Sequence, residues 1–230
     1  MKNGEKRSNS TSSPKVSVLM GLYNQDRFVA ESICAILRQS MSDFELIVVD
    51  DGSTDGSYEI AKTYTQIDKR VRLYQNKENL GQAKTYNIAA SHARGEYMGW
   101  HSSDDKYTAD ALEVLLEPQA DVAYGGHIET NTEVINEYDY ERLKQKCYIF
   151  AGAMIYKRSV YDAVGGYDET FKVAPDWDFT LRACAGRNVV AVPQVVSYYR
   201  QLHIQSNRLK TSEALRASER KRIRAGSYGV

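Results

Sequence analysis

The chain has 230 residues, 30 of them basic and 30 acidic, so its formal net charge at pH 7 is zero. This length is enough for one sizeable core with a smaller appended part, and the balanced charge gives no sign of a nucleic-acid partner. The apolar runs have the length of strands, so no transmembrane helix is predicted. Three widely spaced cysteines argue against a disulfide framework or a zinc site and favour a reduced, cytoplasmic setting.

The first half of the sequence predicts alternating strands and helices. The first fourteen residues are polar, lack the apolar stretch of a signal peptide and are expected to be a disordered lead-in. Buried strands are then expected at 15–23 and 44–49 and a shorter strand at 71–74, with helices at 28–37, capped by Asn24, and at 55–65. This order predicts parallel pairing, as in the nucleotide-binding half of a doubly wound sheet. Neither GxGxxG nor GxxxxGK[ST] occurs, which argues against a dinucleotide oxidoreductase and a P-loop enzyme.

The second half is less regular. Helices are expected at 82–92, at 107–116, from Pro175 to about 185 and, as a basic helix, at 212–224. Strands are expected after Gly95 and at 122–126, 147–156 and 189–199, the last at a sheet edge because it contains Pro193. The segment 127–138 predicts an edge hairpin or a long loop, and residues 165–168 predict a turn.

Acidic residues follow two of the buried strands and begin one helix. Asp50-Asp51 and Asp104-Asp105 stand at strand ends, where open α/β sheets bind ligands, although Asp is also common in plain turns. Adjacent carboxylates suit a Mg²⁺ or Mn²⁺ ion that also holds phosphates. Asp176 stands in the first turn of the Pro175 helix, where an acid can also serve the helix dipole. Asp178 is expected to be structural, and His101 and Trp177 are expected to pack in the core.

Seven segments in order carry a resemblance to a known family. They are VSVLMGLYN, FELIVVDDGSTD, NLG, GEYMGWHSSDD, GGYDETF, PDWDFTLRA and YYRQLH. Together they resemble the inverting family 2 glycosyltransferases of the GT-A fold over residues 15–206. The resemblance implies a single α/β domain with a Rossmann-like, mostly parallel sheet flanked by helices. Residues 15–105 would form its nucleotide-binding half and 106–206 its acceptor half, followed by a basic helix and tail at 207–230.

The resemblance also implies a reaction and its residues. A sugar would pass, with inversion and in one displacement, from a nucleoside diphosphate sugar, most simply a UDP sugar, to a hydroxyl of a carbohydrate or other acceptor. Asp176 would be the catalytic base, and Asp104, Asp105 and His203 would hold Mg²⁺ or Mn²⁺. The implied nucleotide-binding residues are Gly21, Leu22, Tyr23, Asn24, Asp50, Asp51, Asn79, Gly81, Lys84, Ser102, Ser103 and Asp104.

The sequence departs from the family pattern at three positions. Tyr86 stands before Asn87 where the family often carries an Arg after the Asn-x-Gly turn, and Lys84 is the candidate to replace that Arg. Ser102 replaces the first Asp of the DxD motif, and Pro175 replaces the usual Glu before the catalytic Asp. These changes leave a catalytically silent nucleotide-sugar binding module as one alternative. A sugar nucleotidyltransferase is another, but it would need a Gly- and Arg-rich loop where GLYNQDRF stands. The basic C-terminal helix fits a solvated face or a peripheral contact with anionic lipid.

Overall fold

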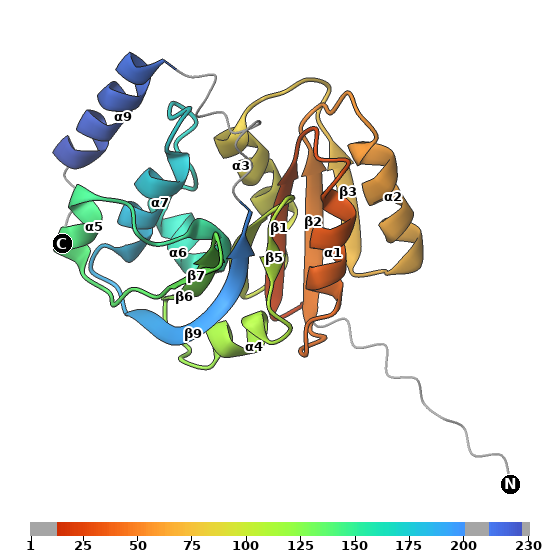
Figure 1. Ribbon diagram of the computed structural model, residues 1–230, viewed down its shortest axis with the longest axis horizontal. Coiled ribbons are helices and arrows are strands. Elements are labelled where there is room, and N and C mark those ends of the chain that lie inside the picture. The colour runs from red at the N-terminus through yellow and green to blue at the C-terminus, as the bar shows by residue number, and fades with distance from the viewer. Residues whose placement is uncertain (1–12, 201–211, 227–230) are drawn as a thin grey trace, which may run out of the picture.

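One mixed sheet organises the molecule. The computed structural model describes residues 13–200 and 212–226. Within them the strand order is β3-β2-β1-β4-β8-β6-β9-β5, with β7 paired to β6 (Figure 1). The strands are β1 (Val16–Leu22), β2 (Phe44–Asp50), β3 (Val71–Gln75), β4 (Tyr97–Ser102), β5 (Lys106–Tyr107), β6 (Val122–Glu129), β7 (Thr132–Val134), β8 (Met154–Lys157) and β9 (Val189–Tyr199). The helices are α1 (Val29–Leu37), α2 (Ser57–Ile67), α3 (Gln82–His92), α4 (Ala111–Leu116), α5 (Tyr140–Gln145), α6 (Arg158–Val164), α7 (Pro175–Cys184) and α9 (Glu213–Ala225).

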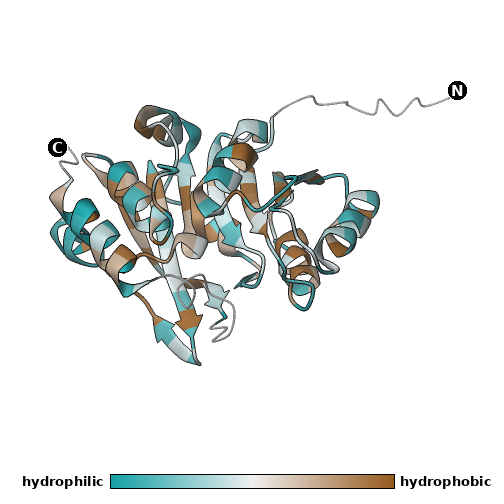
Figure 2. Cartoon of the chain, turned by 90° about the horizontal axis from the view of Figure 1, so that it is seen from above, coloured by the Kyte–Doolittle hydropathy of each residue, from teal (hydrophilic) through white to brown (hydrophobic). Residues whose placement is uncertain are grey.

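The first four strands confirm the predicted parallel unit. β1 pairs in parallel with β2 and β4, and β2 pairs in parallel with β3. Successive side chains of β1 enter two cores, because side chains of a strand alternate between its faces. Val18 and Met20 pack with α1 on one face, and Leu19 packs with α3 on the other. Brown strands enclosed by helices with teal outer faces show this layering in Figure 2.

The second half of the sheet is mixed in direction. β8 is antiparallel to both β4 and β6, and β9 runs parallel to β6. β6 and β7 form a hairpin whose turn residues, Thr130 and Asn131, have φ values of 49° and 65°. Such a turn matches the right-handed twist of the paired strands. The hairpin alternative for 127–138 is therefore confirmed.

Three predicted elements are wrong in extent or place. Only the end of 147–156 is a strand, because Ala151–Ala153 closes a 3₁₀ turn in which Ala153 N donates to Phe150 O at 2.9 Å. α4 begins later than predicted because Lys106–Tyr107 pairs with β9. β9 was expected at a sheet edge, but near its end it lies between β5 and β6 and is therefore an interior strand. Pro193 is tolerated because the register with β6 shifts beside it.

Two local predictions also change. α6 was not predicted; it is short and ends at Gly165, whose φ is 74°. Asn24 does not cap α1, which begins after Phe28; Asn24 has φ 51°, and its Oδ1 accepts from Thr54 N at 2.8 Å. The side chain thus joins the loops that follow β1 and β2.

The C-terminal helix α9 packs against the second half of the molecule, beside α5 and α7 in Figure 1. Its N-cap is Ser212, whose side chain accepts from Leu215 N at 3.2 Å, and its apolar residue Ile223 is buried. Three of its cations have partners within the protein: Arg216 and Arg220 pair with Glu213, and Arg222 pairs with Asp168. Across residues 13–200 and 212–226, none of the helices combines the length and apolar character needed to cross a membrane.

Candidate active site

The predicted site residues of the first half gather at the carboxyl ends of parallel strands. In the ladder, Gly21 faces Ser102 and Leu22 faces Asp50. The residues that follow these strands therefore leave the sheet at one edge, where open α/β sheets bind ligands. Tyr23, the first residue after β1, is 41% exposed, so its ring is available to a bound base.

Asp51 fixes the turn that leads into α3. Its Oδ1 accepts from Asn76 Nδ2 at 2.8 Å and from Leu80 N at 2.9 Å, and its Oδ2 accepts from Gly81 N at 3.0 Å. A carboxylate has about four acceptor positions, so one position on Oδ2 is left for a donor outside these three. Asp51 therefore shapes the Asn79–Gly81 turn and keeps some capacity to accept from a ligand.

Asp50 has a different environment. Its side chain is fully buried, and its Oδ2 accepts from Ser53 N at 3.2 Å and Gln75 Nε2 at 3.1 Å. These bonds hold the turn after β2, in which Gly52 has φ 72° and a Cβ would lie 2.7 Å from the Glu78 carbonyl carbon. A direct contact between Asp50 and a nucleotide stays a prediction, and it would require this turn to open. Asn79 and Lys84 lie exposed at the start of α3.

Asp104 and Asp105 lie where β4 ends. Ser102 Oγ donates to Asp104 Oδ1, and Asp105 Oδ1 accepts from Arg200 N at 2.7 Å. Burial raises the pKa of Asp104. Burial, followed by the charge of Asp104, raises the pKa of Asp105 to about 8. Together the two carboxyl groups form a buried site that favours an added cation.

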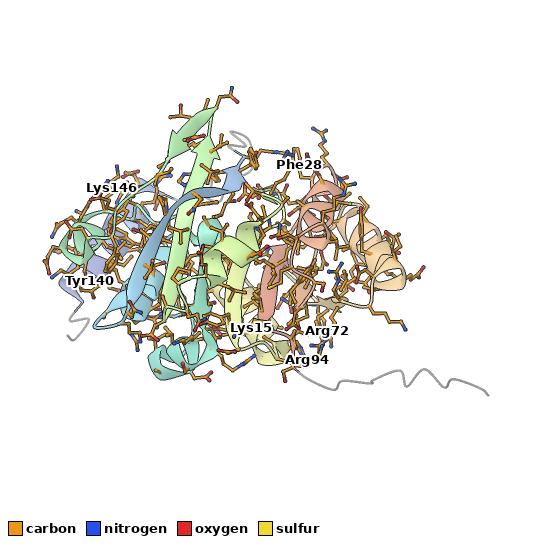
Figure 3. All side chains as sticks on the ribbon, turned by 90° about the horizontal axis from the view of Figure 1, so that it is seen from below. Lys15, Phe28, Arg72, Arg94, Tyr140 and Lys146 are labelled. Atoms are coloured by element: carbon orange, nitrogen blue, oxygen red, sulfur yellow. The ribbon has the colours of Figure 1, made fainter. Side chains whose placement is uncertain are left out.

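At the other end of the sheet, a buried carboxylate has its charge balanced by two arginine side chains. There Glu45 accepts from Arg94 Nη2 at 2.8 Å and from Arg72 Nη1 at 3.0 Å, and Figure 3 places Arg72 and Arg94 together with Lys15 at this end. Burial pushes the pKa of Glu45 upward, but hydrogen bonds, first of all from Arg94, bring it below the ordinary value. Asp104 and Asp105 have weaker compensation from Arg200, whose guanidinium pairs with Glu31 at 2.6 Å.

A divalent cation fits this donor set. Mg²⁺ and Mn²⁺ prefer carboxylate oxygens, and Mg²⁺ commonly uses one or two of them together with waters and substrate phosphates. Residues 13–200 and 212–226 contain no cluster of three or more His, Cys, Asp or Glu side chains that could hold a metal by themselves. His203, the third predicted ligand, lies outside the described residues.

Asp176 begins α7, as predicted, with Pro175 at the first helical positions. Its side chain is half-buried. Asp178, two residues further along the helix, is 3% exposed and pairs with Arg182 Nη2 at 2.6 Å, which agrees with the structural role expected for it. Trp177 is buried and donates from Nε1 to Leu143 O at 2.8 Å, so it is a core residue.

Tyr86 is influenced both by the carboxylates that follow β4 and by Asp176, which the sequence analysis did not predict. Burial raises the pKa of Tyr86, a hydrogen bond with Gln82 lowers it, and the charges of Asp104, Asp176 and Asp105 raise it. All three carboxylates are therefore near enough to act electrostatically on one phenol. The ring also abuts β1, since a Cβ on residue 21 would lie 3.1 Å from Tyr86 Cε1. The available signal was Gly21 itself, a residue without a side chain next to the predicted nucleotide loop.

His101 confirms its predicted place in the core. It is fully buried in β4 and its ring lies 4.1 Å from that of Tyr107 between centroids. Burial lowers the pKa of His101 to about 4, so the imidazole is neutral at pH 7.

Comparison with known proteins agrees with this arrangement. The family model described as Glycosyl transferase family 2 matches residues 17–168. The chain belongs to glycosyl transferase family 2. The matched residues include the strand ends at Asp51 and Asp104 but stop before Asp176, so the family match does not cover the candidate base.

Two relatives show the range of similarity. Glycosyltransferase GlyA of Streptococcus pneumoniae is 29% identical over 177 residues, which are 75% of this chain and 24% of that protein. A PGL/p-HBAD biosynthesis glycosyltransferase of Mycobacterium bovis is 28% identical over 215 residues, 88% of this chain and 83% of that protein. Three relatives are matched over 34%, 24% and 41% of their own lengths, so this chain spans less than half of each of them.

Solved structures confirm the GT-A fold of this family 2 chain. S. aureus TarS 1-349 in complex with UDP matches with a TM-score of 0.71 at 22% identity, over 80% of this chain and 60% of that one. Mannosyltransferase PcManGT from Pyrobaculum calidifontis, in complex with GDP-Man and Mn²⁺, matches with a TM-score of 0.70 at 22% identity. That match covers 94% of this chain and 66% of the other.

Proposed function

We propose that this family 2 chain is an inverting glycosyltransferase. It transfers a sugar from a nucleoside diphosphate sugar to an acceptor hydroxyl in one displacement. The observation that supports this most is that the charges of Asp104, Asp105 and Asp176 all raise the pKa of the one phenol of Tyr86. A diphosphate-binding site at a strand end and a proton acceptor at a helix start are thus close to one another, as a direct displacement requires.

The donor would lie along the carboxyl ends of β1, β2 and β4. Tyr23 would stack on the base, and the remaining acceptor position of Asp51 Oδ2 would receive an N–H from it. A uracil imide N–H suits this acceptor, so we propose UDP as the nucleotide. TarS is solved with UDP and with UDP-GlcNAc, whereas PcManGT is solved with GDP-Man, so both nucleotides belong in the test.

Asp104 and Asp105, together with His203, would hold Mg²⁺ or Mn²⁺. The bound ion would offset the negative charge that develops on the departing diphosphate. Asp104 keeps its Oδ2 for this role, because only Oδ1 accepts from Ser102 Oγ. Ser102 therefore orients Asp104, although it brings no charge of its own.

Asp176 would accept the proton of the acceptor hydroxyl. The hydroxyl oxygen forms a bond to the anomeric carbon from the face opposite the diphosphate, the bond between that carbon and the diphosphate oxygen breaks, and the configuration inverts. The proton passes to a carboxylate oxygen of Asp176, and the electron pair of the broken bond leaves with the nucleoside diphosphate. General-base assistance of this kind is worth about 10²–10⁴ in rate.

The acceptor would be a carbohydrate or another hydroxyl compound, and a role in polysaccharide biosynthesis fits the name of one relative, a putative teichuronic acid biosynthesis glycosyltransferase of Bacillus subtilis. The division into halves at 15–105 and 106–206 and a cytoplasmic location remain proposals. Arg216, Arg220 and Arg222 of α9 already pair within the protein, which leaves fewer of its cations for a peripheral contact with anionic lipid.

A panel of nucleotide sugars tests the function. Thermal unfolding is measured with UDP-glucose, UDP-N-acetylglucosamine and GDP-mannose, with and without Mn²⁺, and release of nucleoside diphosphate is then followed. A donor bound by the folded state raises the melting temperature, and the rise should depend on Mn²⁺. Binding without release, with any of these donors and with added sugar acceptors, would favour the silent binding module. Formation of a nucleotide sugar and pyrophosphate from UTP and a sugar 1-phosphate would favour the nucleotidyltransferase.

A further inference from the structure

The segment just before α7 is held by a side chain from the far end of the sequence. Glu219 of α9 is 5% exposed, and its carboxylate accepts from three successive backbone N–H groups. Lys172 N donates to Oε1 at 2.7 Å, Val173 N donates to Oε2 at 2.9 Å and Ala174 N donates to Oε2 at 3.1 Å. One buried carboxylate thus satisfies every backbone donor of residues 172–174.

These bonds end at the residue from which α7 starts. Ala174 is the N-cap of α7, with φ −133° and ψ 48°, and this helix start has no cap hydrogen bond from an N-cap side chain. Asp178 N bonds back to Ala174 O at 3.2 Å, so the position of Ala174 sets the first turn of the helix. Asp176 is in that turn. A shift of Ala174 therefore moves Asp176 relative to the donor site.

The helix that carries Glu219 has independent anchors on the same region. Ile223 is 1% exposed in the core that includes Phe171 and Trp177. The guanidinium of Arg222 pairs with Asp168 at 2.6 Å and lies 4.0 Å from the centroid of the Phe171 ring. Figure 1 shows α9 lying along this side of the molecule, next to α7. The carboxylate of Glu219 is therefore presented from a packed helix.

We propose that Glu219 is a positioning residue for Asp176. It holds residues 172–174 so that the carboxylate of Asp176 faces the sugar-donor site, and through it α9 becomes part of the acceptor half. This rests on the proposed role of Asp176 as the base. Glu219 itself contacts backbone, so its effect on turnover passes through the position of Asp176.

The test compares Glu219→Gln with the parent and with Glu213→Gln. Gln keeps the size of Glu219, but it has one acceptor oxygen and its NH₂ group faces backbone donors. Glu213 lies on the same helix with a 70% exposed side chain that pairs with Arg216 and Arg220, so Glu213→Gln is the matched control. Measurements are amide hydrogen exchange at residues 172–174, UDP affinity with Mn²⁺ by calorimetry, and release of nucleoside diphosphate from UDP-glucose, UDP-N-acetylglucosamine and GDP-mannose.

In Glu219→Gln, exchange at 172–174 should quicken, and kcat should fall by about tenfold or more, because small misplacements of a reacting group are costly. UDP affinity and the donor KM should stay within about twofold, since the donor half is not touched. Glu213→Gln should resemble the parent in all three measurements. A kcat of Glu219→Gln within about twofold of the parent, despite faster exchange at 172–174, overturns the proposal.

A double variant separates this proposal from the function on which it rests. If Glu219 acts through Asp176, Glu219→Gln should cause no further loss of kcat in an Asp176→Asn background. Equal fractional losses in both backgrounds overturn the positioning role. Full turnover of Asp176→Asn alone, or a parent that releases nucleoside diphosphate from none of the three donors, overturns the proposed function and this inference with it.

Should Glu219→Gln fail to fold, Glu219→Asp carries the same test. Asp keeps the charge on a side chain one methylene shorter, so it should reach fewer of the three amides and give a smaller loss of kcat. A folded Glu219→Asp with parental kcat and faster exchange at 172–174 also overturns the proposal.

Discussion

The two halves of the candidate site are positioned by different means. In the proposed donor half, Tyr23, Asp51 and Asp104 follow neighbouring parallel strands, so the ladder of β1, β2 and β4 sets their relative positions. In the proposed acceptor half, Asp176 lies at a helix start that is held by a carboxylate from α9. A sheet ladder tolerates the loss of one side chain because its bonds are between backbones. A segment held by one side chain does not, so the two halves should respond differently to substitution.

The largest effect is expected from Asp176→Asn. This variant tests whether turnover can be lost while donor binding is kept. The amide keeps the shape and an oxygen but cannot take up a proton, so turnover should fall by about 10²–10⁴. UDP affinity should stay near that of the parent. Initial rates of nucleoside diphosphate release at saturating donor, alongside calorimetry with UDP, make the comparison.

Asp178→Asn is the matched control for that variant. It removes the charge that pairs with Arg182 at 2.6 Å, and it should lower the melting temperature with little change in rate per folded molecule. If Asp178→Asn instead loses turnover while Asp176→Asn stays active, the base has been assigned to the wrong residue of this turn.

Asp104→Ala is expected to change donor binding, the property that Asp176→Asn should leave intact. This change removes one of two adjacent carboxylates, so stabilisation by UDP should lose its dependence on Mn²⁺. The melting temperature without ligand should fall little, because the substitution removes a buried carboxyl group whose pKa is raised by burial. Thermal unfolding with UDP over a series of Mn²⁺ concentrations measures this. An unchanged response to Mn²⁺ would assign the ion to Asp105 and His203 without Asp104.

A pH titration tests the burial of β4, the strand that leads to the proposed metal site. The pKa of His101 is lowered by burial from 6.5 to about 4, so the unfolded chain binds a proton between these values and the folded chain does not. This contribution to stability is complete above about pH 6.5 and is lost as pH falls toward 4. For such a shift the loss between about pH 7 and pH 5 is about 2 kcal/mol.

Denaturant unfolding at several pH values, for the parent and for His101→Leu, measures that loss. The Leu variant cannot titrate at this position, so its stability should fall less steeply between about pH 7 and pH 5. Parallel curves for the two proteins would show that the imidazole titrates with an ordinary pKa and that this part of β4 is open to water.

The smallest effect is expected from Asp51→Asn, which tests how the proposed donor half recognises the nucleotide base. The amide accepts through one oxygen, so one of the bonds to Leu80 N and Gly81 N is lost, together with the acceptor position offered to the base. UDP should bind about tenfold more weakly, which corresponds to about 1.4 kcal/mol. Calorimetry with UDP and GDP makes the measurement, and equal affinity of the parent for both nucleotides would contradict the assignment of uridine.

The amino-acid sequence by itself determined the parallel unit that we propose binds the sugar donor. Apolar runs such as 44–49 specify strands buried on both faces, and the order of strands and helices specifies parallel pairing. The parallel pairing also places Asp51 and Asp104 at the same edge of the sheet, because the residues that follow adjacent parallel strands leave the sheet there. The start of α7 at Pro175 is likewise determined by the local sequence, since proline fits the first helical position.

Only the tertiary structure decided the rest, because the causes lie far apart in the sequence. The apolar segment 147–156 has the composition of one strand, yet its first part turns and only Met154–Lys157 pairs between β4 and β6. β9 is interior because residues 106–107 return to it. The charges of three carboxylates that are far apart in the sequence act on Tyr86, and Glu219 accepts from backbone donors 45 to 47 positions away. Periodicity and turn chemistry report the neighbours of a residue along the chain, whereas these contacts depend on how separately formed elements pack.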